Sequence, residues 1–421
     1  MKSNTSTIQT KNPLWTRDFT IITVGSVISI LGNVLSGFAM DLMVLDYTGS
    51  TLMFAIYNML YLLPNALAPI LIGPFLDRFS RKKTIYVLDF LTAGLFAVMS
   101  VILYSGQFSF IVLAVVNFLL GGIGGIYYVA YDSFYPLLVS EGNYQKAYSV
   151  SSTLETLSVI MVPLSTLIYR AFGIVPLFMA NTATYLIAAI MEMRIRMEEK
   201  YISARAQEDS GKAGLRRFTG DFMEGLRYLA GEKGLLAIAI YFLFSSVTGG
   251  MTGVVTLPYF RSVFENGEYI YTLTWGMGSL ARLLIGIVHY NVRMPAKAKY
   301  NIALTVYISL CLLEGSYLFF SVPIMMAMTF TTGLLGMTSY NIRIAATQKY
   351  VPDEKKGRFN GAFGTLSTVG AFLGQAAAGA LSLAVSERTV VVLANALCLL
   401  AALIFIGGRK KDVERIYNVE T

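Results

Sequence analysis

Two charged side chains lie near the middle of long apolar runs. Glu155 stands in the run at 146–169, and Arg282 stands in the run at 269–290. A charge at the centre of a bilayer is costly and is usually retained because it has a function. Small or polar residues share a helical face with each of them, so a neighbouring helix can approach closely. The chemistry open to these two residues is ion pairing and, for the carboxyl group, proton uptake and release.

Further polar and aromatic side chains lie in the apolar runs. Aromatic residues can form the adaptable wall of a pocket for small molecules, and buried asparagines can bind a ligand or join two helices by hydrogen bonds. These weaker candidates for a substrate cavity are Asn33, Asn58, Tyr61, Tyr127, Tyr131 and Glu314. Asp41, in the outer half of the first run, is a further carboxyl group that could carry a proton or attract a cation.

The composition argues against enzymatic chemistry and against metal binding. The chain has one His and two Cys, Cys311 and Cys398, and each Cys is surrounded by apolar residues. An enzyme buried in a membrane would need clustered His, Cys or paired carboxyl groups. No glycine-rich loop is followed by the Lys-Ser/Thr pair that binds nucleotide phosphates. We therefore expect no catalytic residue, no metal and no cofactor.

The elements that position these residues are membrane-spanning helices. Of the 421 residues, 55% are hydrophobic and 14% are charged, whereas a soluble domain has roughly 25% charged residues. The apolar residues come in stretches of about 20, the length of a helix that spans a bilayer. The sequence predicts an all-α integral membrane protein with twelve spans at 19–45, 52–76, 84–104, 107–137, 146–169, 175–193, 234–260, 269–290, 299–320, 322–345, 358–384 and 387–408.

The basic residues predict which side of the membrane each loop faces. Of the 33 Lys and Arg, 29 fall in one set of loops or in the terminal segments, and only Arg170, Arg261 and Arg388 fall in the opposite set. Because basic loops remain in the cytoplasm, both termini are predicted to be cytoplasmic. The net charge of +8 has the same origin and gives no reason to expect nucleic-acid binding.

A charged segment near the midpoint divides the chain in two. We predict an N-terminal six-helix bundle at 1–193, a cytoplasmic linker at 194–233, a C-terminal six-helix bundle at 234–408 and a tail at 409–421. Thr-Leu-Ser recurs at 156–158 and 365–367, as a repeat of the two halves would place it. Within the linker, residues 218–229 have helical amphipathic spacing, and we interpret them as a packing helix that leads into the seventh span.

The loop after the second span has a distinctive order of residues. It reads Gly-Pro-Phe-Leu-Asp-Arg-Phe-Ser-Arg-Lys-Lys over 73–83. This loop resembles the signature loop of the major facilitator superfamily, with Ser80 in place of the second glycine. The resemblance implies a conformational latch built from Gly73, Asp77, Arg78, Arg81, Lys82 and Asp132. In that arrangement Asp77 approaches the N-terminus of the eleventh span, where the helix dipole favours an anion, and Arg81 pairs with Asp132.

The superfamily fold, two six-helix bundles, also implies roles for the charges in the spans. Its fifth and eighth spans face each other, so Glu155 and Arg282 are predicted to pair and to separate during a transport cycle, with Asp41 lining the cavity. Protonation of Glu155 would weaken the pair and provide one route to proton coupling.

Shorter matches resemble the macrolide-efflux and siderophore-exporter-like branch of the superfamily. They include Thr48-Gly49-Ser50, Pro64, the signature loop, residues 225–229 and residues 351–354. The resemblance implies proton-coupled efflux of a small amphipathic, macrolide- or drug-like molecule by a monomer in the bacterial inner membrane, in contact with its lipids. A lipid or lysolipid transporter and a siderophore exporter are alternatives within transport. A membrane receptor that no longer transports is an alternative outside it.

Overall fold

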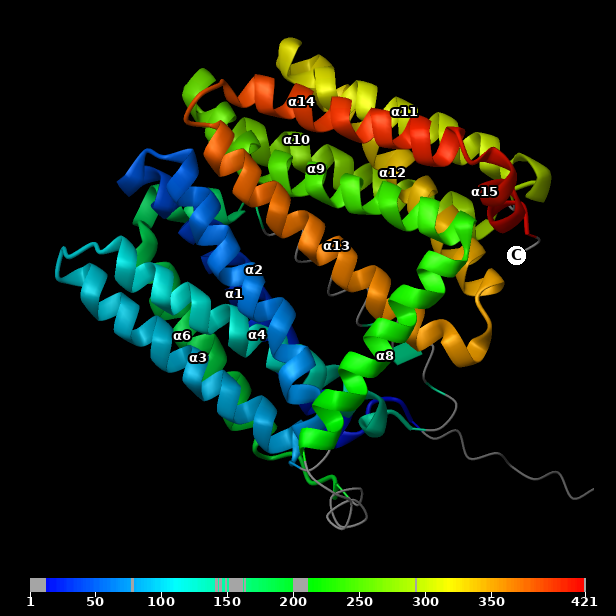
Figure 1. The fold of residues 1–421 in the computed structure, drawn as a ribbon. Coiled ribbons are helices and arrows are strands. Elements are labelled where there is room, and N and C mark those ends of the chain that lie inside the picture. The colour runs from blue at the N-terminus through cyan, green and yellow to red at the C-terminus, as the bar shows by residue number, and fades with distance from the viewer. Residues whose placement is uncertain are drawn as a thin grey trace, which may run out of the picture. The chain divides into compact units, whose positions relative to one another are not determined.

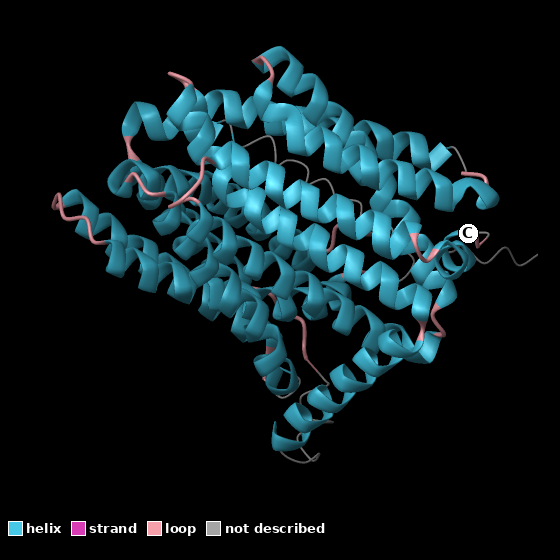
Figure 2. Cartoon of the chain, turned by 45° about the horizontal axis from the view of Figure 1, so that its top comes forward, coloured by secondary structure: helices cyan, strands magenta, loops and turns pink. Residues whose placement is uncertain are grey.

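The computed structural model describes residues 13–76, 79–140, 143, 146–147, 150, 162, 164–199, 211–291 and 294–419. Within these ranges the regular structure is helical, without strands (Figures 1 and 2). The helices are α1 (Arg17–Thr48), α2 (Thr51–Leu76), α3 (Arg81–Tyr104), α4 (Phe110–Leu138), α6 (Ile174–Glu192), α8 (Gly211–Gly231), α9 (Lys233–Val263), α10 (Gly267–Asn291), α11 (Lys299–Ser316), α12 (Val322–Tyr350), α13 (Asp353–Leu381), α14 (Glu387–Ala401) and α15 (Lys410–Tyr417).

Ten helices in the described part of the chain are long and apolar enough to cross a membrane. They coincide with ten of the predicted spans, so the prediction of a multi-pass helical membrane protein is confirmed. The predicted span at 358–384 lies largely on α13, a helix whose glycines, hydroxyl residues and Gln375 lower its mean hydropathy. The predicted span at 146–169 falls largely outside the described residues.

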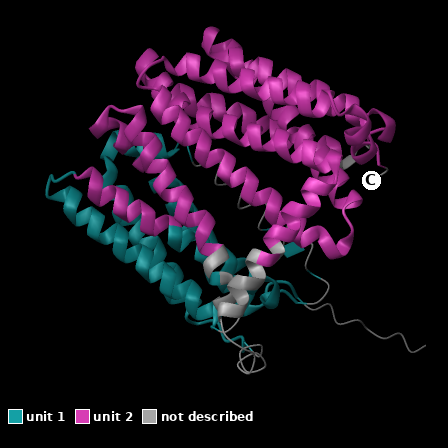
Figure 3. Cartoon of the chain, in the orientation of Figure 1, with its two compact units in different colours: residues 1–39, 71–108, 122–208 teal, residues 40–70, 109–121, 209–421 magenta. Residues whose placement is uncertain are grey.

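The chain divides into two compact units, coloured separately in Figure 3. Unit 1 comprises residues 1–39, 71–108 and 122–208, and unit 2 comprises residues 40–70, 109–121 and 209–421. The division passes through α1, α2 and α4, so each of these helices contributes to both units. The predicted bundle boundaries at 193 and 234 remain predictions.

Unit 1 is organised around α3 and α6, which lie side by side (Figure 1). Phe96 of α3 meets Phe178 of α6 edge to face, with ring centroids 5.2 Å apart. The polar side of α6 faces α1, where the Asn181 amide donates to the Ser36 hydroxyl over 2.6 Å. Burial of aromatic surface and satisfied polar contacts thus hold three helices together.

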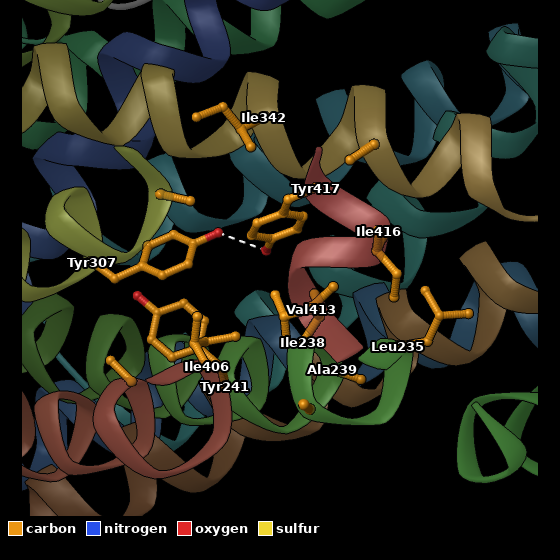
Figure 4. Packing of buried hydrophobic residues seen from close by; sticks show 14 of the residues in the cluster. Leu235, Ile238, Ala239, Tyr241, Tyr307, Ile342, Ile406, Val413, Ile416 and Tyr417 are labelled. Carbon is orange, nitrogen blue, oxygen red and sulfur yellow. Dashed lines mark hydrogen bonds between the residues drawn. The ribbon is translucent and has the colours of Figure 1, made fainter. Parts of the chain in front are cut away.

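Unit 2 has its core between α9, α11, α12 and the short α15 (Figure 4). The apolar face of α15 buries Val413, Ile416 and Tyr417 in that core. The Tyr417 and Tyr307 hydroxyls form a hydrogen bond of 2.8 Å, which satisfies two polar groups away from solvent. The segment after the last predicted span is therefore packed against the core.

Residues 218–229, predicted to form an amphipathic helix, lie within α8. Its apolar face packs on the core of unit 2 through Phe222, Leu226 and the fully buried Leu229. On its polar face, Arg358 of α13 donates to Glu224 over 2.7 Å. These contacts support the interpretation of α8 as a packing helix, because its apolar side chains are covered by protein.

Candidate functional site

A cavity of about 280 Å³ lies in unit 2 between α9, α10, α11 and α12. Such concave sites with apolar walls and a few polar groups are typical of small-molecule binding. The apolar part of the wall includes Trp275, Leu313, Tyr317 and Met328. The polar part includes Thr252, Thr256, Ser279, Arg282, Glu314, Thr329 and Thr332.

Small residues define the shape of this cavity. At the crossing of α10 and α12, a Cβ added to Gly333 would overlap the Gly278 carbonyl and come within 2.9 Å of Ala281 Cβ. The two backbones are therefore in direct contact, which only glycine permits. On the α9 side, Gly249 and Gly253 line the cavity, and a Cβ added to either would have no atom within 4 Å. Glycine thus fixes one wall and leaves space at another.

Arg282 and Glu314 bring opposite charges to the same cavity. Arg282 comes from α10 and Glu314 from α11, and the two charges attract each other electrostatically. An attraction of this kind is stronger where protein walls replace water. The pair can hold an amphipathic ligand by its polar end while the aromatic wall covers its apolar part.

The sequence predicted a different partner for Arg282. Glu155 lies outside the described residues, so the Glu155–Arg282 pair remains a prediction. Glu314 was only a weaker candidate, because nothing in the sequence indicates that α11 shares a cavity with α10. The structure therefore places a carboxyl group, Glu314, in the same cavity of unit 2 as Arg282.

The hydroxyl groups on the wall present acceptors to the cavity. Thr252 donates its proton to the Thr248 carbonyl over 3.0 Å, and Thr256 donates to the Thr252 carbonyl over 2.6 Å. The hydroxyls of Thr329 and Ser279 likewise donate to carbonyls one turn back. Because each proton is used within its own helix, the oxygen lone pairs are what remains for a ligand. The wall suits a ligand that carries hydroxyl or ammonium donors.

Near the end of α9, an arginine contacts α1. Arg261 forms an ion pair with Asp46 and donates to the Leu42 carbonyl over 3.3 Å. Further back along α1, Asp41 interacts electrostatically with Tyr57 of α2 and Tyr271 of α10. All of these residues belong to unit 2. The role predicted for Asp41 in a transport cavity remains a prediction.

The signature loop is described only in part. Asp77 and Arg78 lie outside the described residues, and Gly73 lies in the last turn of α2. Arg81 begins α3 and donates to the Ser133 carbonyl over 3.0 Å. This contact brings Arg81 to the residue next to Asp132, and their pairing remains a prediction.

The first turn of α3 also explains the serine in this loop. Ser80 is the N-cap of α3, and its hydroxyl oxygen accepts from the Lys83 backbone N–H over 3.1 Å. The Glu199 carboxylate accepts from the Arg81 backbone N–H over 2.7 Å and also contacts Ser80, while Lys82 Nζ donates to the Ile195 carbonyl over 3.1 Å. An anion at a helix N-terminus is favourable. No pattern in the sequence singles out Glu199, which lies more than 100 residues from the loop.

The remaining predicted cavity residues have local contacts. Asn58 donates to the Phe54 carbonyl of its own helix over 2.9 Å, while Asn33 is exposed and Tyr61 is 39% exposed. Tyr127 stacks on Tyr131 with ring centroids 5.9 Å apart. Their predicted role in substrate binding remains a prediction.

Comparison with known sequences gives a family match and distant relatives. The family profile of the Major Facilitator Superfamily matches residues 22–374. The chain is 23% identical over 281 residues to YkuC, an uncharacterized MFS-type transporter of Bacillus subtilis strain 168, and the match covers 64% of each protein. It is also 23% identical over 278 residues to macrolide efflux protein A of Streptococcus pyogenes, with 65% of each covered. The matched part of the chain thus spans slightly less than two thirds of the length of these relatives.

Two solved structures with a similar fold are of transporters. A bacterial homologue of the iron transporter ferroportin, in an inward-facing state, has a TM-score of 0.70 at 15% identity, covering 93% of this chain and 98% of its own. The nucleoside transporter NupG has a TM-score of 0.66 at 10% identity, covering 93% of this chain and 99% of its own. At these identities the likeness concerns the fold alone.

Proposed function

Because this chain belongs to the Major Facilitator Superfamily, we propose that it is a secondary active transporter that exports amphipathic, macrolide- or drug-like molecules in exchange for protons. The family and the transporter folds indicate a transporter and not an enzyme. Alternating access in this fold moves two bundles about a central site. The direction of transport, the substrate class and the coupling ion go beyond what the family alone indicates, and they are what we propose.

We further propose twelve spans with both termini in the cytoplasm of a bacterial cell. Ten spans are found among the described helices. α13 would provide the eleventh in chain order, and the segment at 146–169 would provide the fifth. The excess of Lys and Arg on one set of loops supports the cytoplasmic placement.

The observation that carries the substrate class is the cavity of unit 2. Its wall joins aromatic and thioether side chains to one cation, one carboxyl group and several hydroxyl acceptors. A macrolide carries hydroxyl groups and an amine on a large apolar ring, and the cavity of about 280 Å³ would receive the part of it that bears the amine. The distant likeness to macrolide efflux protein A supports the same class.

Substrate binding can be measured directly because the chain has only two Trp residues, Trp15 and Trp275. Trp275 lines the cavity, whereas Trp15 lies before α1. In a Trp15→Phe variant, all tryptophan fluorescence comes from the cavity wall. We would titrate the purified protein in detergent with a macrolide, a lipophilic cation, a siderophore and a lysolipid, and follow Trp275 emission.

We expect a saturable change in Trp275 emission with the macrolide and the lipophilic cation. The added substitution Glu314→Gln should weaken this change, whereas Glu265→Gln, which neutralises an exposed carboxyl group in the same unit, should leave it intact. A response to lysolipid alone would favour a lipid transporter. Absence of any response to the four compounds would contradict a substrate site in this cavity.

A further inference from the structure

Unit 1 contains two carboxyl groups that are sealed from solvent. Asp89, in the third turn of α3, is 1% exposed, and Glu192, the last residue of α6, is 0% exposed. The two side chains face each other at hydrogen-bonding range. Two like charges at such a distance and burial strongly oppose each other.

None of the described residues donates a hydrogen bond to the three buried carboxyl oxygens of this pair. Both Glu192 carboxyl oxygens and Asp89 Oδ2 are buried without a hydrogen-bond partner in the described part of the chain. Two ionised carboxylates cannot hydrogen-bond to each other, because both only accept. If one of them carries a proton, the contact between Asp89 and Glu192 becomes a hydrogen bond and each carboxyl group gains a partner.

The groups around the pair do not balance its charge. From α1, the backbone at Gly25 approaches Glu192, whose Oε1 lies 3.3 Å from the position of an added Cβ. From α4, Tyr127 interacts electrostatically with both carboxyl groups and Tyr131 with Glu192. Tyr185 of α6 lies beside Tyr127. Within the described residues, no Lys, Arg or His contributes to the electrostatics of either carboxyl group.

The α1 side carries a further buried hydroxyl. Ser29 lies one turn beyond Gly25 on the same face of α1, and its Oγ has no hydrogen-bond partner among the described residues. Ser26 is already engaged, since its hydroxyl donates to the Ile22 carbonyl over 2.8 Å and its oxygen lies 3.1 Å from the Tyr131 hydroxyl. Polar atoms without partners thus occur on α1 as well as on α3 and α6.

We infer that Asp89 and Glu192 form a proton-binding site in unit 1, in which the two carboxyl groups share one proton. Pairs of close carboxyl groups hold a proton because they cannot both ionise. The proton comes from solvent and returns to solvent, so no other reactant is needed. The inference that this pair binds a proton does not depend on any transport activity. The use of the site to couple proton flow to export rests on the function proposed above.

The test is infrared spectroscopy of the purified full-length protein in detergent, without substrate. A protonated carboxyl group has a C=O stretching band that ionised carboxylates lack and that shifts in D2O. We expect this band at neutral pH in the wild type and in Glu198→Gln, which removes an exposed carboxyl group six residues after Glu192. We expect its loss in the Asp89→Asn/Glu192→Gln double variant, whose amides preserve the shape of the site.

If the double variant does not fold, the single variants Asp89→Asn and Glu192→Gln decide the question, because each should change the band of the wild type. The band must lose intensity as the pH is raised and must exchange in D2O. Its absence at every pH, or an unchanged spectrum in the folded double variant, would overturn the inference. A spectrum of ionised carboxylates that changes on addition of calcium or sodium ions would also overturn it, because the pair would then hold a metal cation. A failed substrate titration would leave these outcomes unaffected, so the two proposals can fail separately.

Discussion

Units 1 and 2 each keep a carboxyl group inside the protein, and they do so in different ways. In unit 1, Glu192 faces another carboxyl group, Asp89, in a sealed place where no described cation balances the charge. In unit 2, Glu314 faces Arg282 across a cavity of about 280 Å³. A buried carboxyl group can be neutralised by a proton or by a cation. The first solution fits proton binding, and the second leaves space for a ligand.

This difference separates two tasks that one transporter must perform. The sealed pair can bind a proton but has no cavity for a substrate, whereas the lined cavity can bind a substrate between its charges. If the proposed export is correct, variants of the two pairs should have different phenotypes. Substitutions in each unit test that separation, and the largest effect is expected where two helices touch.

The first prediction concerns the helix crossing beside the cavity. Gly333→Leu should lower the free energy of unfolding by about 1–3 kcal/mol, because the side chain would be forced between two touching backbones. Gly336→Leu, on the same helix, is the matched control, since no atom lies within 4 Å of its added Cβ. Thermal unfolding in detergent measures the difference. Equal losses in the two variants would contradict the close contact of α10 and α12.

The second prediction removes one charge from the cavity. Arg282→Gln and Glu314→Gln should each weaken the response of Trp275 to a macrolide by about tenfold or more, since a hydrogen bond to a charged group contributes roughly 1.5–3 kcal/mol. Arg409→Gln and Glu265→Gln remove the same charges at exposed positions and should change nothing. Fluorescence titration in the Trp15→Phe background provides the measurement.

A charge swap sharpens this second prediction. The double variant Arg282→Glu/Glu314→Arg restores opposite charges and should recover part of the binding that each single neutral variant loses. A swap that recovers nothing would indicate that the two charges act separately.

The third prediction concerns pH. The native Asp89–Glu192 pair holds a proton that the same carboxyl groups release when they are exposed in the unfolded chain. The native state then binds more protons, so stability should fall as the pH rises. The Asp89→Asn/Glu192→Gln variant should show a shallower fall in its thermal transition than the wild type or Glu198→Gln. The same slope in all three proteins would contradict proton sharing by the pair.

The smallest effect is expected from the ion pair between α1 and α9. Because the Arg261 and Asp46 side chains are 20% and 25% exposed, solvent screens them, and Asp46→Asn should cost only about 0.2–1 kcal/mol of stability. The loss should shrink in high salt. Thermal unfolding at two salt concentrations checks this, and a loss that does not depend on salt would indicate packing in place of charge.

The sequence was sufficient to predict the helices and insufficient to predict their neighbours. The apolar run predicted at 84–104 corresponds to α3, and the amphipathic spacing at 218–229 corresponds to part of α8. Hydropathy and periodicity are local properties, so they can be read from neighbouring residues. Which helices share a cavity depends on tertiary packing, so the sequence does not indicate that Glu314 lines the same cavity as Arg282.

Glu192 is a carboxyl group whose burial the sequence only partly indicates. It lies inside the predicted span at 175–193, but its proximity to Arg194 gives it the character of a residue at the membrane interface. Asp89 lies inside the predicted span at 84–104, close to the signature loop at the start of the same helix. Only the packing of α3 against α6 brings the two carboxyl groups together.

The central claim is that one carboxyl pair binds protons and the other charged pair binds substrate. The most direct test uses inside-out vesicles with an imposed proton gradient and a pH-sensitive dye, to which a macrolide is added. We predict that the macrolide collapses the gradient in the wild type and in Glu198→Gln. The macrolide should not collapse the gradient in Glu314→Gln, because this variant no longer binds the macrolide. It should not collapse the gradient in Asp89→Asn/Glu192→Gln either, although this variant keeps the Trp275 response to the macrolide. A double variant that moves protons like the wild type, or one that no longer binds the macrolide, would contradict the claim.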